Sequence, residues 1–241
     1  VTVVDGYGLT ESAPVIGVRP VFGGVKRTMT LLEGTEAKIL DEAGRAVEPG
    51  EKGTLYVRGP QVMDGYFKRP DLTAEVLSED GWLNTGDLAM WTHHGEFAIV
   101  GRAKDTIVLS GGENLEPLPI EAKLAESEFI ERAVVLGQDQ RFLGALIVIN
   151  ADRITQYLEE QRIPFLRDSI SEMQEVRKLI GEEISSLINE KQGFKSYEQI
   201  VRFHLLAERF EVGKQLSAKE EVRRFAIQEL YTVEIASLFA S

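Results

Sequence analysis

The stretch Gly101-Arg102-Ala103-Lys104-Asp105-Thr106-Ile107-Val108-Leu109-Ser110-Gly111-Gly112-Glu113-Asn114 separates two differently patterned parts of the chain. Before it, short β-type runs are broken by Gly and Pro turns, and after it β-type runs alternate with increasingly long helical patterns. Charged residues followed by a Gly pair suit a hinge that also touches a phosphorylated ligand. We therefore expect an α+β protein with one domain over residues 1–101 and a second over residues 102–241.

Short strands dominate the first part. Residues 37–40 and 53–58 have β-type composition, and the turn Asp41-Glu42-Ala43-Gly44 follows the first of these runs. The pattern predicts a small β-rich layer or barrel. The chain also enters an extended run directly at Val1, which we interpret as the interior of a domain whose earlier residues lie upstream.

A long amphipathic helix is the main feature expected in the second part. It should begin near Leu166, where Ser169 and Glu172 have capping-box spacing, and it should stop at Gly193. Its apolar stripe could serve a membrane or a partner, but packing against the domain's own sheet is the favoured interpretation. The β-type runs that precede it cover residues 106–109, 133–136 and 145–149.

A last helix is expected over residues 218–238. Ser217 and Glu220 again have capping-box spacing at its start. The apolar residues expected to share its buried face are Val222, Phe225, Ala226, Leu230 and Val233.

Composition narrows the classes of function. The 241 residues carry 27 Lys and Arg against 39 Asp and Glu, and a net charge of -12 argues against nucleic acid as a partner and against nonspecific attachment to an anionic membrane. Cys is absent, so these residues hold no disulfide, thiolate nucleophile or Cys-ligated zinc, which is compatible with a cytoplasmic protein. No apolar run reaches the roughly 18 to 20 residues of a membrane-spanning helix. We expect a soluble chain, and the three His disfavour a His-rich metal site.

The segment Gly6-Tyr7-Gly8-Leu9-Thr10-Glu11-Ser12 carries residue types suited to a nucleotide. Its glycines allow the backbone to approach a planar ligand, and Tyr7 offers a stacking face. Thr10 can donate to a phosphate oxygen, and Glu11 can ligate Mg²⁺. The alternative interpretation is a strand-to-turn junction with a core Tyr.

A second such segment is Asp80-Gly81-Trp82-Leu83-Asn84-Thr85-Gly86-Asp87-Leu88. A carboxylate at Asp87 can accept hydrogen bonds from two vicinal hydroxyls, as a ribose presents them. The alternative is an ordinary Asp in a turn.

Taken together and in this order, these segments resemble the AMP-forming acyl-CoA synthetases, an adenylating superfamily shared with firefly luciferase and nonribosomal peptide adenylation domains. The matching motifs are Tyr-Gly-Leu-Thr-Glu at residues 7–11, Gly-Trp-Leu-Asn-Thr-Gly-Asp at residues 81–87, and Gly-Arg-Ala-Lys-Asp-Thr-Ile at residues 101–107. Gly-Glu-Asn-Leu-Glu-Pro at residues 112–117 is most similar to the long-chain fatty acid branch. The resemblance covers nearly the whole chain and thins after residue 150.

For the first domain, the resemblance implies the β-rich remainder of a large adenylate-binding domain. The nucleotide-binding residues would include Gly8 beside Tyr7, which would pack on adenine. Thr10 would contact the α-phosphate and Glu11 would bind Mg²⁺. The other two nucleotide-binding positions are Asp87, on the ribose hydroxyls, and Arg102, at the ribose or phosphates.

For the second domain, the resemblance implies a small, mobile α+β unit. Lys104 would occupy the hinge about which this domain rotates between adenylation and thioester formation. Gly111 and Gly112 would border the pantetheine tunnel of CoA. The family's Ser/Thr/Gly-rich loop, which holds the β- and γ-phosphates of ATP, is missing from these residues, so residues 1–241 alone are not expected to make acyl-adenylate.

The sequence departs from the family where a catalytic Lys is expected. Many members have Leu-Thr-Pro-Thr-x-Lys-Leu-Lys-Arg there, whereas residues 216–224 read Leu-Ser-Ala-Lys-Glu-Glu-Val-Arg-Arg, with Glu221 at the Lys position. A carboxylate would repel the anionic substrates. Three alternatives remain: Lys219 takes over the catalytic role, Lys214 does, or adenylation is weak. We favour Lys219, which could also be merely a solvent-facing cap residue.

The resemblance implies a long-chain fatty acid CoA ligase with fatty acid, ATP/AMP, Mg²⁺ and CoA as ligands. Alternatives are a fatty-acyl-AMP ligase or acyl-carrier-protein ligase on the same scaffold, and a noncatalytic module that has lost adenylation. The expected location of the full-length enzyme is cytoplasmic, with peripheral contact with a membrane left open. Neither acyl chain length nor oligomeric state follows from these residues.

Overall fold

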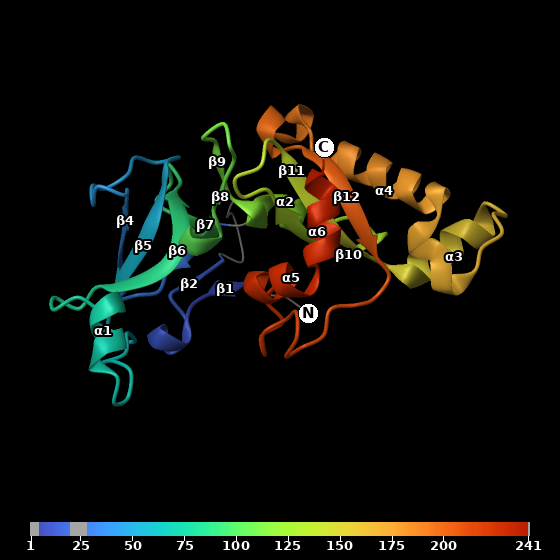
Figure 1. The fold of residues 1–241 in the computed structure, drawn as a ribbon. Coiled ribbons are helices and arrows are strands. Elements are labelled where there is room, and N and C mark those ends of the chain that lie inside the picture. Colours follow the sequence, from blue (N-terminus) through green and yellow to red (C-terminus); the bar gives the residue numbers. More distant parts are fainter. Residues whose placement is uncertain (1–4, 20–27, 241) are drawn as a thin grey trace. The chain divides into compact units, whose positions relative to one another are not determined.

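The chain divides into two compact units, Val1–Lys104 and Asp105–Ser241 (Figure 1). The computed structural model describes residues 5–19 and 28–240, so the extended run expected at Val1 lies outside the described residues. The junction of the units follows Lys104, whereas the sequence analysis put it after Gly101.

A four-stranded antiparallel sheet forms the centre of the first unit. Its strands lie side by side in chain order: β4 (Glu36–Leu40), β5 (Lys52–Arg58), β6 (Leu83–Trp91) and β7 (Phe97–Arg102). Side chains of a strand alternate between its two faces, and every second residue of β5 and β6 is buried. The core includes Leu55, Val57, Leu83, Ala89 and Phe97.

The first two strands of this sheet and the turn after the first of them lie where the sequence predicts them. The strands expected at residues 37–40 and 53–58 are β4 and β5, and the turn between them closes through the Asp41 N–H, which donates to the Arg45 carbonyl at 2.9 Å. Gly44 has φ of 77°, which a residue without Cβ adopts at little cost. Both predictions are confirmed.

A second, smaller sheet carries the first motif. Its strands are β1 (Gly6–Tyr7), β2 (Gly17–Val18) and β3 (Thr30–Leu31), all antiparallel. A 3-10 turn, η1 (Thr10–Ser12), lies between β1 and β2, and the short helix α1 (Pro70–Val76) precedes β6.

A mixed three-stranded sheet forms the second unit. β10 (Ile130–Leu136) is antiparallel to the central strand β11 (Leu143–Ile149), which is parallel to β12 (Ile200–Leu206). All seven residues of β11 are buried. A continuous apolar strand is expected where both faces of a sheet are covered, and this is the case here.

Helices cover the two faces of this sheet (Figure 1). On one face Ile147 packs with residues of α2 (Pro117–Leu124), α3 (Ala151–Glu160) and α4 (Gln174–Leu187). On the other, Leu146 packs with α5 (Arg224–Leu230) and α6 (Thr232–Phe239). The hairpin of β8 (Ile107–Val108) and β9 (Asn114–Leu115) precedes α2. The predicted α+β fold is confirmed.

The long helix of the second unit begins later and ends earlier than predicted. Residues 167–172 form a 3-10 turn, η3 (Arg167–Glu172), in which Ser169 has non-helical angles and its hydroxyl donates to the Leu166 carbonyl at 3.3 Å. The predicted capping box is therefore wrong, because the Ser side chain binds the backbone behind it. At the other end, the Asn189 amide donates to the carbonyls of Ser185 and Ser186 and closes α4 after Leu187.

Gly193 ends a separate 3-10 turn, η4 (Glu190–Gln192), and not the long helix. A further 3-10 turn, η5 (Ser196–Glu198), leads into β12. Packing of α4 against its own sheet is confirmed, since Ile180 and Ile184 belong to the core around β11.

The last helix is also shorter than predicted and is split. Residues 217–222 form a turn with Glu220 at φ of 60°, α5 starts at Arg224, and Tyr231 separates α5 from α6. The predicted capping box is wrong, and the predicted apolar face is correct only in part. Val222 packs against the core, whereas Phe225, Leu230 and Val233 are exposed. The buried residues of this segment are Ile227 and Leu238.

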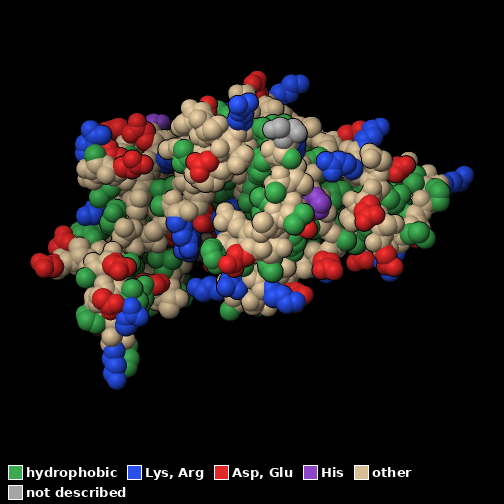
Figure 2. Space-filling view, in the orientation of Figure 1, with side chains coloured by type: hydrophobic (Ala, Val, Ile, Leu, Met, Phe, Trp, Pro, Cys, Tyr) green, Lys and Arg blue, Asp and Glu red, His purple; other side chains and the backbone are tan. Residues whose placement is uncertain are grey.

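Both acidic and basic side chains are present on the surface, as the 39 Asp and Glu and 27 Lys and Arg of the sequence lead one to expect. On the face drawn in Figure 2, acidic and basic side chains are interspersed and not segregated. Among the described residues, none of the helices has the length and apolar character needed to cross a membrane.

Candidate functional site

The carboxylate of Asp87 is built into the core side of β6. It belongs to the same series of buried, every-second positions as Leu83, Thr85 and Ala89, and only 4% of Asp87 is exposed. The Thr85 hydroxyl accepts from the Asp87 N–H at 3.1 Å and donates to the Leu55 carbonyl at 2.8 Å. The strand thus fixes the Asp87 side chain in place.

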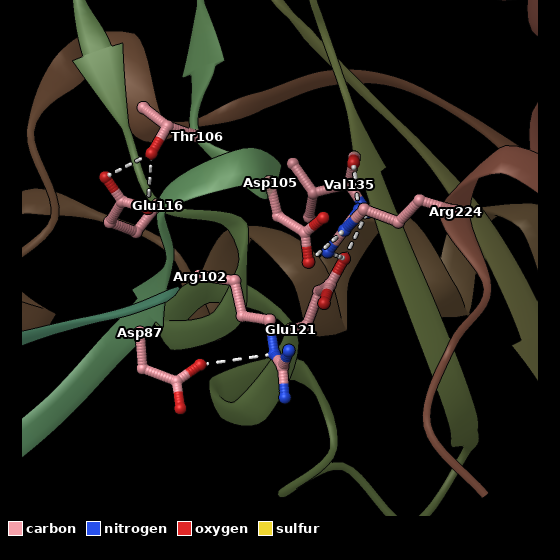
Figure 3. A network of polar contacts seen from close by, with 8 residues as sticks. All are labelled: Asp87, Arg102, Asp105, Thr106, Glu116, Glu121, Val135 and Arg224. Atoms are coloured by element: carbon pink, nitrogen blue, oxygen red, sulfur yellow. Dashed lines mark hydrogen bonds and ion pairs between the residues drawn. The ribbon is translucent and has the colours of Figure 1, made fainter. Parts of the chain in front are cut away.

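Tyr7 and Arg102 both help to compensate the buried charge of Asp87. The Tyr7 hydroxyl donates to Oδ2 at 2.6 Å, and Arg102 Nε lies 3.2 Å from Oδ1. Asp87 and Arg102 are register partners on β6 and β7, so Arg102 reaches the carboxylate from the neighbouring strand (Figure 3). A buried carboxylate without such partners would cost several kcal/mol, about 2 or more even for a neutral polar group.

The Tyr7 side chain links the small sheet to Asp87. Its ring contacts Phe97 edge-on, with 5.9 Å between ring centroids. Burial, and then the neighbouring charge of Asp87, raise the pKa of the Tyr7 phenol far above its usual value. Tyr7 therefore stays a hydrogen-bond donor. A carboxylate offers about four acceptor positions, more than the two that Tyr7 and Arg102 occupy.

Only glycine fits at position 8 of this loop. A Cβ on Gly8 would lie 1.6 Å from the Pro14 carbonyl oxygen, which leaves no space for any side chain. Thr10, exposed at the start of η1, follows directly, and the Ser12 hydroxyl closes the loop by accepting from the Leu9 N–H at 3.0 Å.

Glu11 is partly buried and held by Tyr66. The Tyr66 hydroxyl donates to Glu11 Oε1 at 2.7 Å, and this hydrogen bond raises the pKa of Tyr66. No group of three or more metal-binding side chains occurs in the described part of the chain. Mg²⁺ is commonly held by one or two carboxylates together with substrate phosphates, so Glu11 fits as a single protein ligand to a Mg-nucleotide.

The remaining predicted residues lie on exposed turns. Lys104 is in η2 (Ala103–Asp105). Gly111 and Gly112 form the tip between β8 and β9, where the Gly112 N–H donates to the Leu109 carbonyl at 2.8 Å and Gly112 has φ of 90°.

Lys219 lies on the turn of residues 216–222, called here the Lys219 turn. An antiparallel bridge between Leu216 and Val222 closes it, and the Ser217 hydroxyl accepts from the N–H groups of Lys219 and Glu221, each at 3.2 Å. The Lys219 and Glu221 side chains are exposed. Lys214, the other candidate cation, pairs with Glu211 at 2.8 Å.

The structure therefore brings together Tyr7, Asp87 and Arg102 in the first unit, with Thr10 and Glu11 on the adjoining loop. It places Gly111, Gly112 and Lys219 in the second unit. Sequence reasoning assigned no role to Tyr66, Glu116, Glu121 or Arg224, although each takes part in a polar contact here. Tyr66 is 55 residues from Glu11, so no local pattern could have revealed the pair.

Two family models match the chain. Residues 1–67 match the family model "AMP-binding enzyme", and residues 104–241 match "AMP-binding enzyme C-terminal domain".

Curated relatives include fatty acid ligases. The chain is 38% identical over 99% of its length to probable acyl-activating enzyme 16 of Arabidopsis thaliana, and 45% identical over 74% to the long-chain-fatty-acid–[acyl-carrier-protein] ligase AEE15 of the same plant. It is 35% identical over 77% of its length to the long-chain-fatty-acid–CoA ligase of Escherichia coli O157:H7. The chain spans 34%, 26% and 32% of these three proteins.

Among solved structures, the chain is similar to the A domain of a carboxylic acid reductase from Segniliparus rugosus, solved with AMP and a co-purified carboxylic acid. The TM-score is 0.77 at 27% identity, over 98% of this chain and 35% of that one. A carboxylate reductase adenylation domain from Mycobacterium chelonae has a TM-score of 0.79 at 23% identity, over 99% of this chain and 35% of that one. With matches to both family models and this shared fold, the chain belongs to the AMP-binding enzyme family of adenylate-forming ligases.

Proposed function

We propose that the complete protein that contains this chain activates a long-chain fatty acid with Mg-ATP and passes the acyl group to CoA. In the first step a carboxylate oxygen of the acid attacks the α-phosphorus, which forms acyl-AMP and releases pyrophosphate. In the second, the CoA thiol attacks the acyl carbon and AMP leaves. The protein's contribution is mainly orientation and charge stabilisation.

The observation that carries this proposal is the paired, buried carboxylate of Asp87. It lies within the Asn-Thr-Gly-Asp segment, and Tyr7 and Arg102 hold one oxygen each. A fixed carboxylate can select a vicinal diol, since hydrogen bonds to charged acceptors contribute about 1.5 to 3 kcal/mol each. We assign the ribose hydroxyls to Asp87, the adenine face to Tyr7, and the ribose or phosphates to Arg102.

The adjoining loop would serve the phosphate end of the nucleotide. Thr10 would donate to the α-phosphate, and Gly8 keeps the loop compact. Glu11 would be the protein ligand of Mg²⁺, which when bound neutralises phosphate charge.

In the second unit, Lys219 is the cation that we assign to the adenylation step, and Lys104 to the hinge. Lys214 is the alternative cation, and its hydrogen bond to Glu211 raises its pKa. Gly111 and Gly112 would border the pantetheine arm of the acceptor.

An acyl carrier protein is the second candidate acceptor. The observation in its favour is the identity of 45% to an acyl-carrier-protein ligase, compared with 35% to the CoA ligase of Escherichia coli O157:H7. Both acceptors present the same pantetheine thiol, so the first half-reaction would be common to both.

Isotope exchange between pyrophosphate and ATP tests the first step. The complete protein should catalyse exchange that depends on a long-chain fatty acid, and the isolated 241 residues should not. No acid-dependent exchange by the complete protein would contradict the proposed function. Adding CoA or pantetheinylated carrier protein in parallel, and measuring thioester formation, then identifies the acceptor.

A further inference from the structure

We propose that Arg224 is a positioning residue that fixes the Lys219 turn to Asp105, at the start of the second unit, and to helix α2. The proposal rests on the proposed function only for the role of Lys219. The placement itself follows from contacts within the second unit.

The Arg224 guanidinium binds three groups at once (Figure 3). Nη2 lies 2.7 Å from Glu121 Oε1 on α2, Nη1 donates to the Val135 carbonyl on β10 at 3.1 Å, and Nε lies 3.5 Å from Asp105 Oδ2. Glu121 Oε1 also accepts from the Val135 N–H at 2.8 Å. A planar guanidinium suits such a multidentate site, and an ammonium does not.

Burial distinguishes this cluster from the other ion pairs of the second unit. The side chains of Arg224, Glu121 and Asp105 are 19%, 12% and 26% exposed. By contrast, Arg209 pairs with Glu131 at 2.7 Å with 67% of its own side chain exposed. Exposed pairs contribute little to stability, typically about 0 to 1 kcal/mol, whereas removal of one partner from a sheltered network leaves the other charges uncompensated.

The cluster is directly joined to the Lys219 turn by the backbone. Arg224 follows Val222, the last residue of the turn, by two positions, and the Arg223 N–H donates to the Gln215 carbonyl at 2.8 Å on the other side of the turn. Arg132 on β10 donates to the Glu220 carbonyl at 3.3 Å. The turn is thus held at its base by Arg224 and near its tip by Arg132.

The contacts also connect the turn to the junction of the units. Asp105 is the first residue of the second unit and directly follows Lys104. Any rotation about this junction therefore moves Asp105, Arg224 and the Lys219 turn as one body. The cation would reach the reacting carboxylate through the orientation of the whole unit and not through a flexible loop.

Two readouts test the role of Arg224 in the complete protein. Amide hydrogen exchange of residues 217–222 should be about fivefold faster in Arg224→Gln, because the base of the turn is released. The adenylation kcat should fall about tenfold or more, with KM for ATP within about twofold, because a misplaced group affects rate more than binding. Arg224→Lys should restore little, since an ammonium cannot bind Glu121, Val135 and Asp105 together.

Arg209→Gln is the matched control, because it removes an exposed ion-paired Arg from the same segment. It should leave both readouts unchanged. The proposal is overturned if hydrogen exchange in the turn is the same in Arg224→Gln as in the unchanged protein, or if Arg209→Gln produces equal effects. A complete protein that performs no adenylation would refute the proposed function, and hydrogen exchange alone would then decide the positioning role.

Discussion

Two regions proposed to act on the same acyl-adenylate are built in opposite ways. Asp87 is on a central strand and 4% exposed. Tyr7 and Arg102 bind its side chain, and Thr85 of the same strand binds its backbone N–H. Lys219 is on an exposed turn whose position depends on contacts at its base and near its tip. A ligand-anchoring group gains from rigidity in the core, whereas a cation that has to arrive and leave is best carried at the surface of a unit that moves.

The difference predicts different consequences of mutation. Loss of the Asp87 carboxylate should affect folding and binding together, because Tyr7 and Arg102 lose a buried partner. Loss of the Lys219 side chain should affect rate alone, since surface substitutions usually change stability by less than about 0.5 kcal/mol.

Lys219→Ala should have the largest effect on the first half-reaction. In the complete protein we expect adenylation to fall by about 10² to 10³, the range measured for removal of one group that stabilises transition-state charge. Thioester formation from supplied acyl-AMP should persist. Pyrophosphate exchange and single-turnover transfer assays measure the two steps separately.

Lys214→Ala is the control for this prediction, because Lys214 is the other candidate cation and lies on the same segment. It should adenylate normally. If Lys214→Ala loses adenylation and Lys219→Ala does not, the catalytic cation is Lys214. In that event, Lys219 only caps the turn.

Asp87→Ala should have the next largest effect. Nucleotide affinity in the complete protein should fall at least about tenfold, as expected for loss of charged hydrogen bonds of about 1.5 to 3 kcal/mol. Asp87→Asn keeps the volume and should also bind poorly. Asp80→Ala, which removes an exposed carboxylate bound to the Ser78 hydroxyl at 2.6 Å, is the control. Nucleotide affinities are measured by titration calorimetry. If all three variants bind AMP and ATP as tightly as the unchanged protein does, the ribose assignment is contradicted.

Lys104→Pro probes the connection between the two regions and should have a smaller effect. Proline fixes φ near about -65° and restricts the junction. Thioester formation should slow severalfold more than adenylation if Lys104 is the hinge, as proposed, and the second step follows rotation of the second unit. Lys104→Ala removes the charge and leaves the backbone unrestricted. It therefore distinguishes an effect of the restricted backbone from an effect of the lost charge. Equal losses in both steps for Lys104→Pro would indicate general misfolding.

Local patterns allowed much of the first region to be predicted from the sequence. Alternating burial and Gly turns identify β4 and β5, and the Asn-Thr-Gly-Asp motif points to Asp87. Tyr66 could not be identified as the partner of Glu11, because the fold alone brings them together across 55 residues.

The end of the second unit was poorly predicted for a physical reason. Ser217 and Glu220 have the spacing of a capping box, but the Ser217 hydroxyl stabilises a turn in which Glu220 is left-handed. Because α5 begins only at Arg224, its buried residue is Ile227, which the predicted stripe did not include. The break at Tyr231 then resets the helical period, so the stripe counted through it placed Val233 on the wrong face.

Tyr7→Phe keeps the ring and should have the smallest effect on activity. Beyond the constant loss of one donor to Asp87, its specific effect is on the pH dependence of stability at alkaline pH. Burial and the charge of Asp87 raise the pKa of Tyr7 above its ordinary value of 10.0. The unfolded chain therefore loses this proton first. Below about pH 9 the contribution of the protonated phenol to stability is fully present, and as pH rises past about 10 the free energy of unfolding falls, by up to about 1.4 kcal/mol per pH unit. In Tyr7→Phe the contribution of this phenol to the dependence of the free energy of unfolding on pH should disappear.

Both Trp residues, Trp82 and Trp91, lie in the first unit, so Trp fluorescence in urea reports the unit that contains Tyr7. Comparing the free energy of unfolding at about pH 8 and at about pH 11 should give a smaller difference for Tyr7→Phe than for the unchanged protein. Tyr197→Phe removes a hydroxyl from the second unit and should leave the difference unchanged. If the free energy of unfolding changes with pH in the same way in Tyr7→Phe and in the unchanged protein, the Tyr7 hydroxyl is not held by Asp87. Of the two side-chain contacts proposed to fix the Asp87 carboxylate, only the one with Arg102 would then remain.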